Sequence, residues 1–105
     1  MAKGAVMDDL FFEWDEEKAA SNLSKHGVSF LAAAAIFDHE VIDRIDDRED
    51  YGELRHVALG RCGSTVLRVV YTWRSEQTIR LISAQKAGRH EREIYYRSIF
   101  GARSP

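Results

Sequence analysis

The sequence predicts an α+β domain: a mostly antiparallel sheet of about four or five strands, with two helices before it and one after it. Three consecutive segments, residues 55–61, 65–73 and 78–86, are rich in β-branched and aromatic residues and are separated by short linkers. Short linkers join antiparallel neighbours, so these segments are expected to form a meander. Helical patterns precede and follow this block.

The N-terminal part predicts a leader, a short strand and a helix. Residues 1–9 show no periodicity and are expected to form a flexible leader, so the domain is expected to span residues 10–105. Residues 10–14 (LFFEW) predict a strand. Asp15 then provides an N-cap for a helix, and Gly27 supplies the left-handed conformation that commonly ends one.

The remaining segments complete the predicted fold. Ser29 can cap a second helix, residues 30–37, which is apolar nearly all round and is therefore expected to be buried against the sheet. Residues 41–45 (VIDRI) alternate between apolar and charged side chains, which predicts a half-exposed strand. The charged stretch 46–53 predicts a loop. Residues 88–100 predict a closing helix with one apolar stripe.

Composition is ordinary for a globular domain of 105 residues, with 45% hydrophobic and 30% charged residues. No apolar run approaches the length needed to cross a bilayer, and the N-terminus lacks the layout of a signal peptide, so we expect a cytoplasmic protein without membrane contact. Cys62 is the only cysteine, which excludes an internal disulfide and favours a structural role for this thiol.

Charge is distributed unevenly along the chain. Residues 1–60 hold 6 Lys and Arg against 14 Asp and Glu, whereas residues 61–105 hold 9 against 3. A basic second half indicates one surface for a polyanion, although two solvated surfaces would give the same count.

Several classes of chemistry find no support in the sequence. There is no GxxxxGK phosphate loop, and the His-Glu pair at 90–91 lacks the second histidine of a HExxH motif because Ile94 stands there. The four histidines show no metal-ligand spacing, and no GxSxG elbow exposes a serine. We therefore expect neither a metal nor another cofactor.

Arginines on and beside the predicted strands form the constellation with the clearest chemistry. Metal-free RNA cleavage needs a base, an acid and fixed cations for the charge that develops on the phosphate, and arginine suits the third role. A salt-bridged sheet is the alternative, and strand alternation leaves open whether Arg68 and Arg80 share a face. The candidate cations are Arg55, Arg61, Arg68, Arg80, Lys86 and Arg89.

Four residues are candidates for proton transfer, each with a structural alternative. They are His26, Glu53, His56 and Tyr71. Glu53 can instead be a solvated loop residue, His26 can cap a helix end, and Tyr71 can belong to the core.

The longest motif lies at residues 14–30 and resembles the opening signature of the BrnT family, WDxxKxxxNxxKHGVxF. In this chain it is WDEEKAASNLSKHGVSF. Two later segments also resemble the family: RHVALGR at 55–61, and IRLISAQKAGRHEREIYY at 79–96. The resemblance covers about 90 residues, with spacings far more specific than an arginine count.

The resemblance implies a RelE-like fold and the toxin role in a type II toxin–antitoxin pair. Such toxins cut RNA without a metal. They are neutralised by a BrnA-like antitoxin that carries a ribbon-helix-helix domain. The resemblance thus implies three partners: the antitoxin, an RNA substrate, and operator DNA bound only through the antitoxin.

Matching the signature residue by residue suggests site residues. Lys25 and His26 match the KHG motif, Arg55 and Arg61 bound the matching strand, and Arg80 and Ser83 match the IRxxSA strand. Structural roles explain other positions, Trp14, Asn22 and Gly27 among them. Gln85 stands where the family usually has arginine. The glutamine side chain can still form hydrogen bonds, but it carries no positive charge. Lys86 is one position away and is expected to point to the opposite face.

Three functions fit these observations. The first is an endoribonuclease with Arg80 and Arg61 stabilising phosphate charge and Lys25 or His26 assisting proton transfer. Its RNA would be positioned by Arg55, Arg68, Ser83, Gln85, Lys86 and Arg89. The second is an attenuated homologue that only binds antitoxin and supports autorepression, which Gln85 favours. The third is nucleic-acid binding without cleavage.

Overall fold

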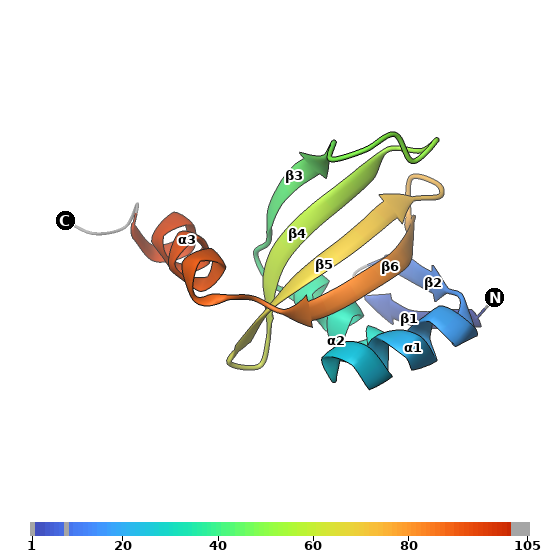
Figure 1. Ribbon diagram of the computed structural model, residues 1–105, viewed down its shortest axis with the longest axis horizontal. Coiled ribbons are helices and arrows are strands. Elements are labelled where there is room, and N and C mark those ends of the chain that lie inside the picture. The colour runs from blue at the N-terminus through green and yellow to red at the C-terminus, as the bar shows by residue number, and fades with distance from the viewer. Residues whose placement is uncertain (1, 8, 102–105) are drawn as a thin grey trace.

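The computed structural model describes residues 2–7 and 9–101, which form one six-stranded sheet, two helices packed on one of its faces and a third helix at one end (Figure 1). The strands are β1 Ala2–Met7, β2 Leu10–Trp14, β3 Ile42–Asp46, β4 Arg55–Cys62, β5 Thr65–Trp73 and β6 Thr78–Lys86. The helices are α1 Glu16–His26, α2 Phe30–Ala35, the 3-10 turn η1 Ile36–Asp38, and α3 Arg89–Phe100.

The sheet has the strand order β1-β2-β6-β5-β4-β3. The run from β3 to β6 is an antiparallel meander, and β2 joins β6 in parallel through residues 11–13 and 78–80. The predicted α+β class, with two early helices and one C-terminal helix, is confirmed. The described residues contain one strand more than the upper end of the expected count.

That additional strand corrects the expectation of a flexible leader over residues 1–9. Ala2–Met7 forms β1, which pairs antiparallel with β2 across an irregularity between Lys3 and Val6. One edge of β2 pairs with β6, and its other edge is the one with which β1 pairs. Residues 1 and 8 lie outside the described residues.

The main core lies between the sheet and the layer formed by α1 and α2. We call this side of the sheet the helix face, and on the central strand β5 it carries Leu67, Val69 and Tyr71, all buried. Phe30 and Ile36 pack against it from the helix layer. The predicted burial of the second helix is therefore confirmed on its inner side, while Leu31 on its outer side is exposed.

Local signals set the helix boundaries. The Asp15 carboxylate accepts hydrogen bonds from the first-turn N–H groups of α1, and Gly27 ends that helix at φ 69°. Ser29 caps α2 as predicted. The expected helix over residues 30–37 is shorter, because η1 follows at Ile36 and passes close to β4: a Cβ on Gly60 would lie 2.8 Å from the Ile36 Cβ.

The other side of the sheet is covered differently. On β5 it carries Val66, Arg68, Val70 and Thr72, and neither α1 nor α2 lies over it (Figure 1). α3 packs against one end, where Tyr95 is buried among apolar side chains that include Leu59 and Val66.

The Asn22 side chain joins α1 to β6. Only the first part of β6 is paired with β2, so no strand among the described residues pairs with the outer edge around Ala84. The amide group of Asn22 replaces that partner: it accepts from the Ala84 N–H (3.0 Å) and donates to the Ala84 carbonyl (2.8 Å) and the Val28 carbonyl (2.9 Å). The buried backbone groups are thereby satisfied.

We predict that Asn22→Ala destabilises the protein by about 2–4 kcal/mol, because both polar backbone groups of Ala84 lose their partner. The Tm should fall by about 10 °C or more in thermal unfolding followed by circular dichroism. Ser21→Ala, at the exposed neighbouring position, is the matched control and should change stability by less than about 0.5 kcal/mol. Equal Tm values for the two variants would contradict this role of Asn22.

Candidate nucleic-acid interface

Strand register gathers five arginines on the side of the sheet opposite α1 and α2. Arg68 lies opposite Leu59 of β4, Arg80 lies opposite Thr72 of β5, and Arg44 lies opposite Val57. Since cross-strand partners share a face, and alternate residues of one strand do too, all these side chains lie on the same side. We call this side the arginine face, after Arg44, Arg55, Arg61, Arg68 and Arg80.

The register answers the question that the sequence left open about Arg68 and Arg80. An extra residue, Ile82, interrupts the β5–β6 ladder, because Tyr71 pairs with Leu81 while Val70 pairs with Ser83. This β-bulge belongs to β6, so the alternation along β5 is unbroken and carries Arg68 to the same side as Arg80.

The same ladder places Ser83 and Gln85 on the arginine face and Lys86 on the other side. Gln85 lies directly opposite Arg68. Lys86 lies opposite Leu67, and lines a 330 Å³ cavity beside Val28 on the helix face. Lys86 is therefore not brought together with the arginines, as the alternation predicted, and it does not substitute for a charge at position 85.

Lys25 and His26 approach the arginine face at its edge. Both are exposed in the last turn of α1, and with Ser83 they line a 190 Å³ cavity at the β-bulge. The Asn22 contact to Ala84 holds this end of α1 against β6. An imidazole and an amino group thus lie beside a hydroxyl of the arginine face.

Carboxylates hold several of the arginines in place. The Arg68 Nε lies 3.2 Å from Glu91 of α3, and the Arg55 Nε lies 3.0 Å from Glu53. Arg55 also stacks on the Tyr51 ring, 4.1 Å from its centroid. Such pairs orient the guanidinium groups and reduce the net positive charge of the face.

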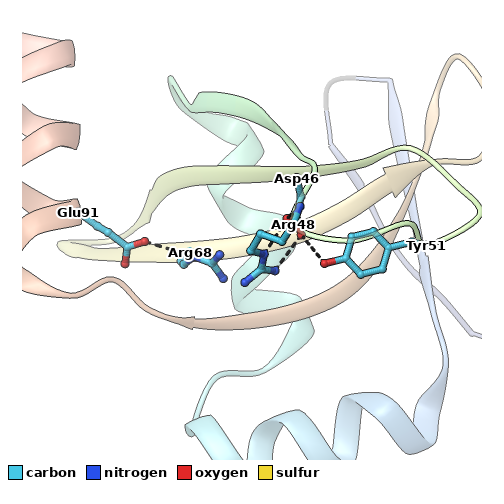
Figure 2. Close-up of polar contacts among 5 residues, drawn as sticks. All are labelled: Asp46, Arg48, Tyr51, Arg68 and Glu91. Carbon is cyan, nitrogen blue, oxygen red and sulfur yellow. Dashed lines mark hydrogen bonds and ion pairs between the residues drawn. The ribbon is translucent and has the colours of Figure 1, made fainter.

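A second acid–arginine cluster lies in the loop after β3. The buried Asp46 carboxylate accepts two hydrogen bonds from Arg48, at 2.7 and 2.8 Å, and one from the Tyr51 hydroxyl at 3.3 Å. The hydrogen bonds from Arg48 hold the pKa of Asp46 well below its ordinary value. Figure 2 shows this cluster together with the Arg68–Glu91 pair.

Sequence reasoning missed Arg44, Arg48, Tyr51 and Asp46. The alternation in VIDRI could have assigned Arg44 to a face, but only pairing with β4 tells which face that is. The charged stretch that follows predicted only a loop, and its back-folding onto Asp46 has no signal in the sequence pattern.

Two of the proton-transfer candidates lie away from the arginine face, and the third, Glu53, contacts one of its arginines. His56 and Tyr71 lie on the helix face, where the Tyr71 hydroxyl and the His56 Nδ1 (2.8 Å) both contact Asp43. Burial, and then the hydrogen bond to Asp43, raise the pKa of Tyr71, so the phenol is a neutral donor near neutral pH. Glu53 is paired with Arg55.

The last two cations lie near α3. Arg89 begins that helix, is highly exposed and forms an ion pair with Glu93 at 3.3 Å. Arg61 lies on the arginine face at the end covered by α3, where it lines a 510 Å³ cavity with Tyr95. Its Nε is buried and has no hydrogen-bond partner.

Residues 2–7 and 9–101 contain neither a cluster of metal ligands nor a helix suited to a membrane. No group of three or more His, Cys, Asp or Glu side chains is arranged to hold a metal ion there. None of the helices in that part of the chain combines the length and apolar character needed to cross a membrane. Cys62 is a free, half-buried thiol.

Comparison with known proteins identifies the family. A family model described as the ribonuclease toxin BrnT of a type II toxin–antitoxin system matches residues 14–91. The crystal structure of the Brucella abortus ribonuclease toxin BrnT is similar in fold, with a TM-score of 0.55 and 21% identity over 74% of this chain and 96% of that chain. No curated protein sequence gives a significant match. The family match spans most of the sequence, and the chain belongs to the BrnT family of type II toxins.

Proposed function

We propose that this chain is a metal-independent endoribonuclease whose RNA substrate lies across the arginine face. Family membership supports a ribonuclease toxin in general. The observation that carries the finer proposal is the register, which gathers five arginines from four strands on one side of the sheet. Such a surface suits a phosphate backbone, because each guanidinium can hold two phosphate oxygens.

The proposed reaction uses the substrate's own 2′-hydroxyl as the nucleophile. A base removes its proton, the 2′-oxygen bonds to phosphorus, and the bond to the 5′-oxygen breaks as an acid protonates that leaving group. The products are a 2′,3′-cyclic phosphate and a 5′-hydroxyl end. The protein has to supply proton transfer and fixed cations, without a cofactor.

We assign the cationic role to Arg80 and proton transfer to His26, with Lys25 beside it. Arg80 and Ser83 lie on one face of β6, roughly 10 Å apart along the strand. Ser83 shares its cavity with His26 and Lys25. The scissile phosphate is proposed to lie between Arg80 and Ser83, where the imidazole can reach the reacting oxygens.

Positioning of the RNA is proposed for the other polar side chains of this face. Arg55 and Arg68 are already oriented by carboxylates, while Ser83 and Gln85 supply hydrogen bonds and Arg89 adds charge at the start of α3. Lys86 is left out because it lies on the helix face. Arg61 lies in the cavity beside α3, so it is not assigned to the scissile phosphate.

The antitoxin is the proposed regulator. A toxin of a type II system has a protein antitoxin as its partner, and the resemblance to BrnT pairs favours a BrnA-like protein with a ribbon-helix-helix domain. Operator DNA would then be bound through the antitoxin alone.

A second candidate function is a non-catalytic homologue that only binds antitoxin. The observation that favours it is Gln85, which lies directly opposite Arg68 where the family usually supplies another arginine. Arg68 is itself paired with Glu91, so this part of the face carries less free positive charge than an arginine pair would.

We predict that the purified chain cleaves single-stranded RNA in EDTA, because the proposed chemistry needs no metal. The product ends should be 2′,3′-cyclic phosphates, detected by mass spectrometry of a defined oligonucleotide. A substrate with a 2′-O-methyl group at the cleavage site is the matched control and should stay intact. Cleavage that appears only after a divalent metal is added would overturn metal independence.

Gln85→Arg should raise the cleavage rate by up to about 100-fold, because it adds a cation to the arginine face. Initial rates on the same oligonucleotide measure this change. Lys86→Arg, one position along but on the helix face, is the control and should have no such effect. If neither the original chain nor Gln85→Arg cleaves RNA while both bind antitoxin, the non-catalytic function replaces the first.

Arg80→Gln should lower kcat by about 100- to 1,000-fold, the usual loss when one preorganised donor to a developing charge is removed. Arg74→Gln is the matched control: Arg74 pairs with Glu13 at 3.5 Å and has no role in the proposal, so its variant should retain activity. An unchanged kcat for a folded Arg80→Gln protein would remove Arg80 from the mechanism.

A further inference from the structure

Phe11 of β2 is an aromatic side chain on the arginine face, and the proposed reaction does not use it. It lies opposite Thr78 of β6, and alternation along β6 places Thr78 on the same side as Arg80. The next residue, Phe12, lies opposite Ile79 and is fully buried on the helix face. Phe11, by contrast, is 39% exposed, so solvent reaches its ring.

The environment of Phe11 differs from that of the other aromatic residues of the sheet. The described strands contain five Phe, Tyr or Trp residues, and the four besides Phe11 lie on the helix face: Phe12, Trp14, Tyr71 and Trp73. Each of those four packs against another aromatic ring. Among the described residues no ring pairs with Phe11, although its backbone N–H is fixed by a 2.7 Å hydrogen bond to the Gln77 carbonyl. Phe11 is thus held in place with part of its ring open to a ligand.

Arg80, the cation assigned to the scissile phosphate, is a close neighbour of Phe11. The two residues lie on adjacent parallel strands and two positions apart in register, which places their Cα atoms about 8 Å apart. Ser83 lies farther along β6, on the other side of Arg80. A phosphate between Arg80 and Ser83 therefore has Phe11 just beyond the guanidinium, within reach of a base attached to the same stretch of backbone.

A nucleobase is the ligand that matches a phenyl ring beside a cation. Proteins that bind single-stranded RNA combine cations that follow the phosphates with aromatic side chains on which unstacked bases lie. Each of the four bases has a flat π-face, so such stacking needs no particular base sequence. Phe11 and Arg80 supply these two elements next to each other on one face of the sheet.

We propose that Phe11 is a base-stacking residue that holds the nucleobase next to the scissile phosphate. The inference rests on the proposed function, because Phe11 acts on the RNA that Arg80 contacts. It concerns single-stranded RNA, since a base inside a duplex is already stacked on both faces and cannot lie on the Phe11 ring.

Two uncleavable probes separate base stacking from phosphate binding. One is a fluorescently labelled heptamer of 2′-O-methyluridine, and the other is a 2′-O-methyl heptamer of the same backbone that carries no bases. Anisotropy gives the Kd of each. The unmodified protein should bind the uridine heptamer more tightly, and the ratio of the two Kd values measures the contribution of the bases.

Phe11→Ala should reduce this ratio by roughly 5- to 100-fold, the usual effect of removing one aromatic stacking partner. Phe11→Leu keeps an apolar side chain on the strand and should lose most of the same contribution. The Kd of the heptamer without bases, and its dependence on salt, should stay unchanged in both variants because the arginines are intact.

Matched variants show whether the effect belongs to this ring. Trp73→Leu removes a ring of similar exposure, 42%, from the helix face and should keep the ratio. Phe11→Trp should keep it as well, since an indole also stacks on bases. The added indole should be quenched by the uridine heptamer to a greater extent than the tryptophans of the unmodified protein, and the heptamer without bases should not quench it.

The outcomes separate the stacking residue from the ribonuclease proposal. An unchanged Kd ratio in folded Phe11→Ala and Phe11→Leu overturns the stacking role and leaves the arginine face as the RNA surface. Equal weakening of both heptamers by these variants also overturns it, because the loss is then independent of bases. Failure of the unmodified protein to bind either heptamer overturns both the stacking role and the RNA surface.

Discussion

The antiparallel register between β4, β5 and β6 decides which side chains of this protein can act together. Along each strand the side chains alternate, so a shift of one residue would move Arg68 to the helix face and bring Leu67 to the solvent side. The buried helix-face residues Leu67 and Val69 make that shift costly. Packing of the core therefore fixes the arginines on the opposite side.

The β-bulge at Ile82 adds a local exception with a functional consequence. Without the extra residue, Ser83 would keep strict alternation with Arg80 and lie on the helix face. With it, Ser83 and Gln85 join the arginine face, and Ser83 borders the cavity that contains His26. Asn22 bonds to Ala84 just beyond the bulge, so the end of α1 is held next to the irregular part of the strand.

The arginine face combines positively charged guanidinium groups with carboxylates that pair with some of them. Arginines that share one face repel one another, and carboxylates from the loop after β3 and from α3 offset part of that charge. Glu91 has two contacts, since one carboxylate oxygen accepts the Gly88 N–H at the start of α3 and the other faces Arg68. The position of α3 thus affects both the charge at Arg68 and the cavity at Arg61.

The sequence alone determined the order and type of most elements, because strand composition, helix caps and turn residues act locally. Asp15, Gly27 and Ser29 bound their helices as their residue types indicate, and the KHG signature pointed to the right family. It failed for residues 2–7, whose strand depends on an edge supplied by β2.

Only the tertiary structure decided which candidates form one site. Whether two arginines on different strands share a face depends on cross-strand pairing and on one bulged residue, neither of which is encoded by spacing along the chain. The same is true of His56 and Tyr71, whose side chains contact Asp43 on the helix face. It is also true of Arg61, which lines a cavity that exists because Tyr95 anchors α3 against β4 and β5. Local sequence patterns determine the helices and strands, while the shared site arises from contacts between segments far apart in the sequence.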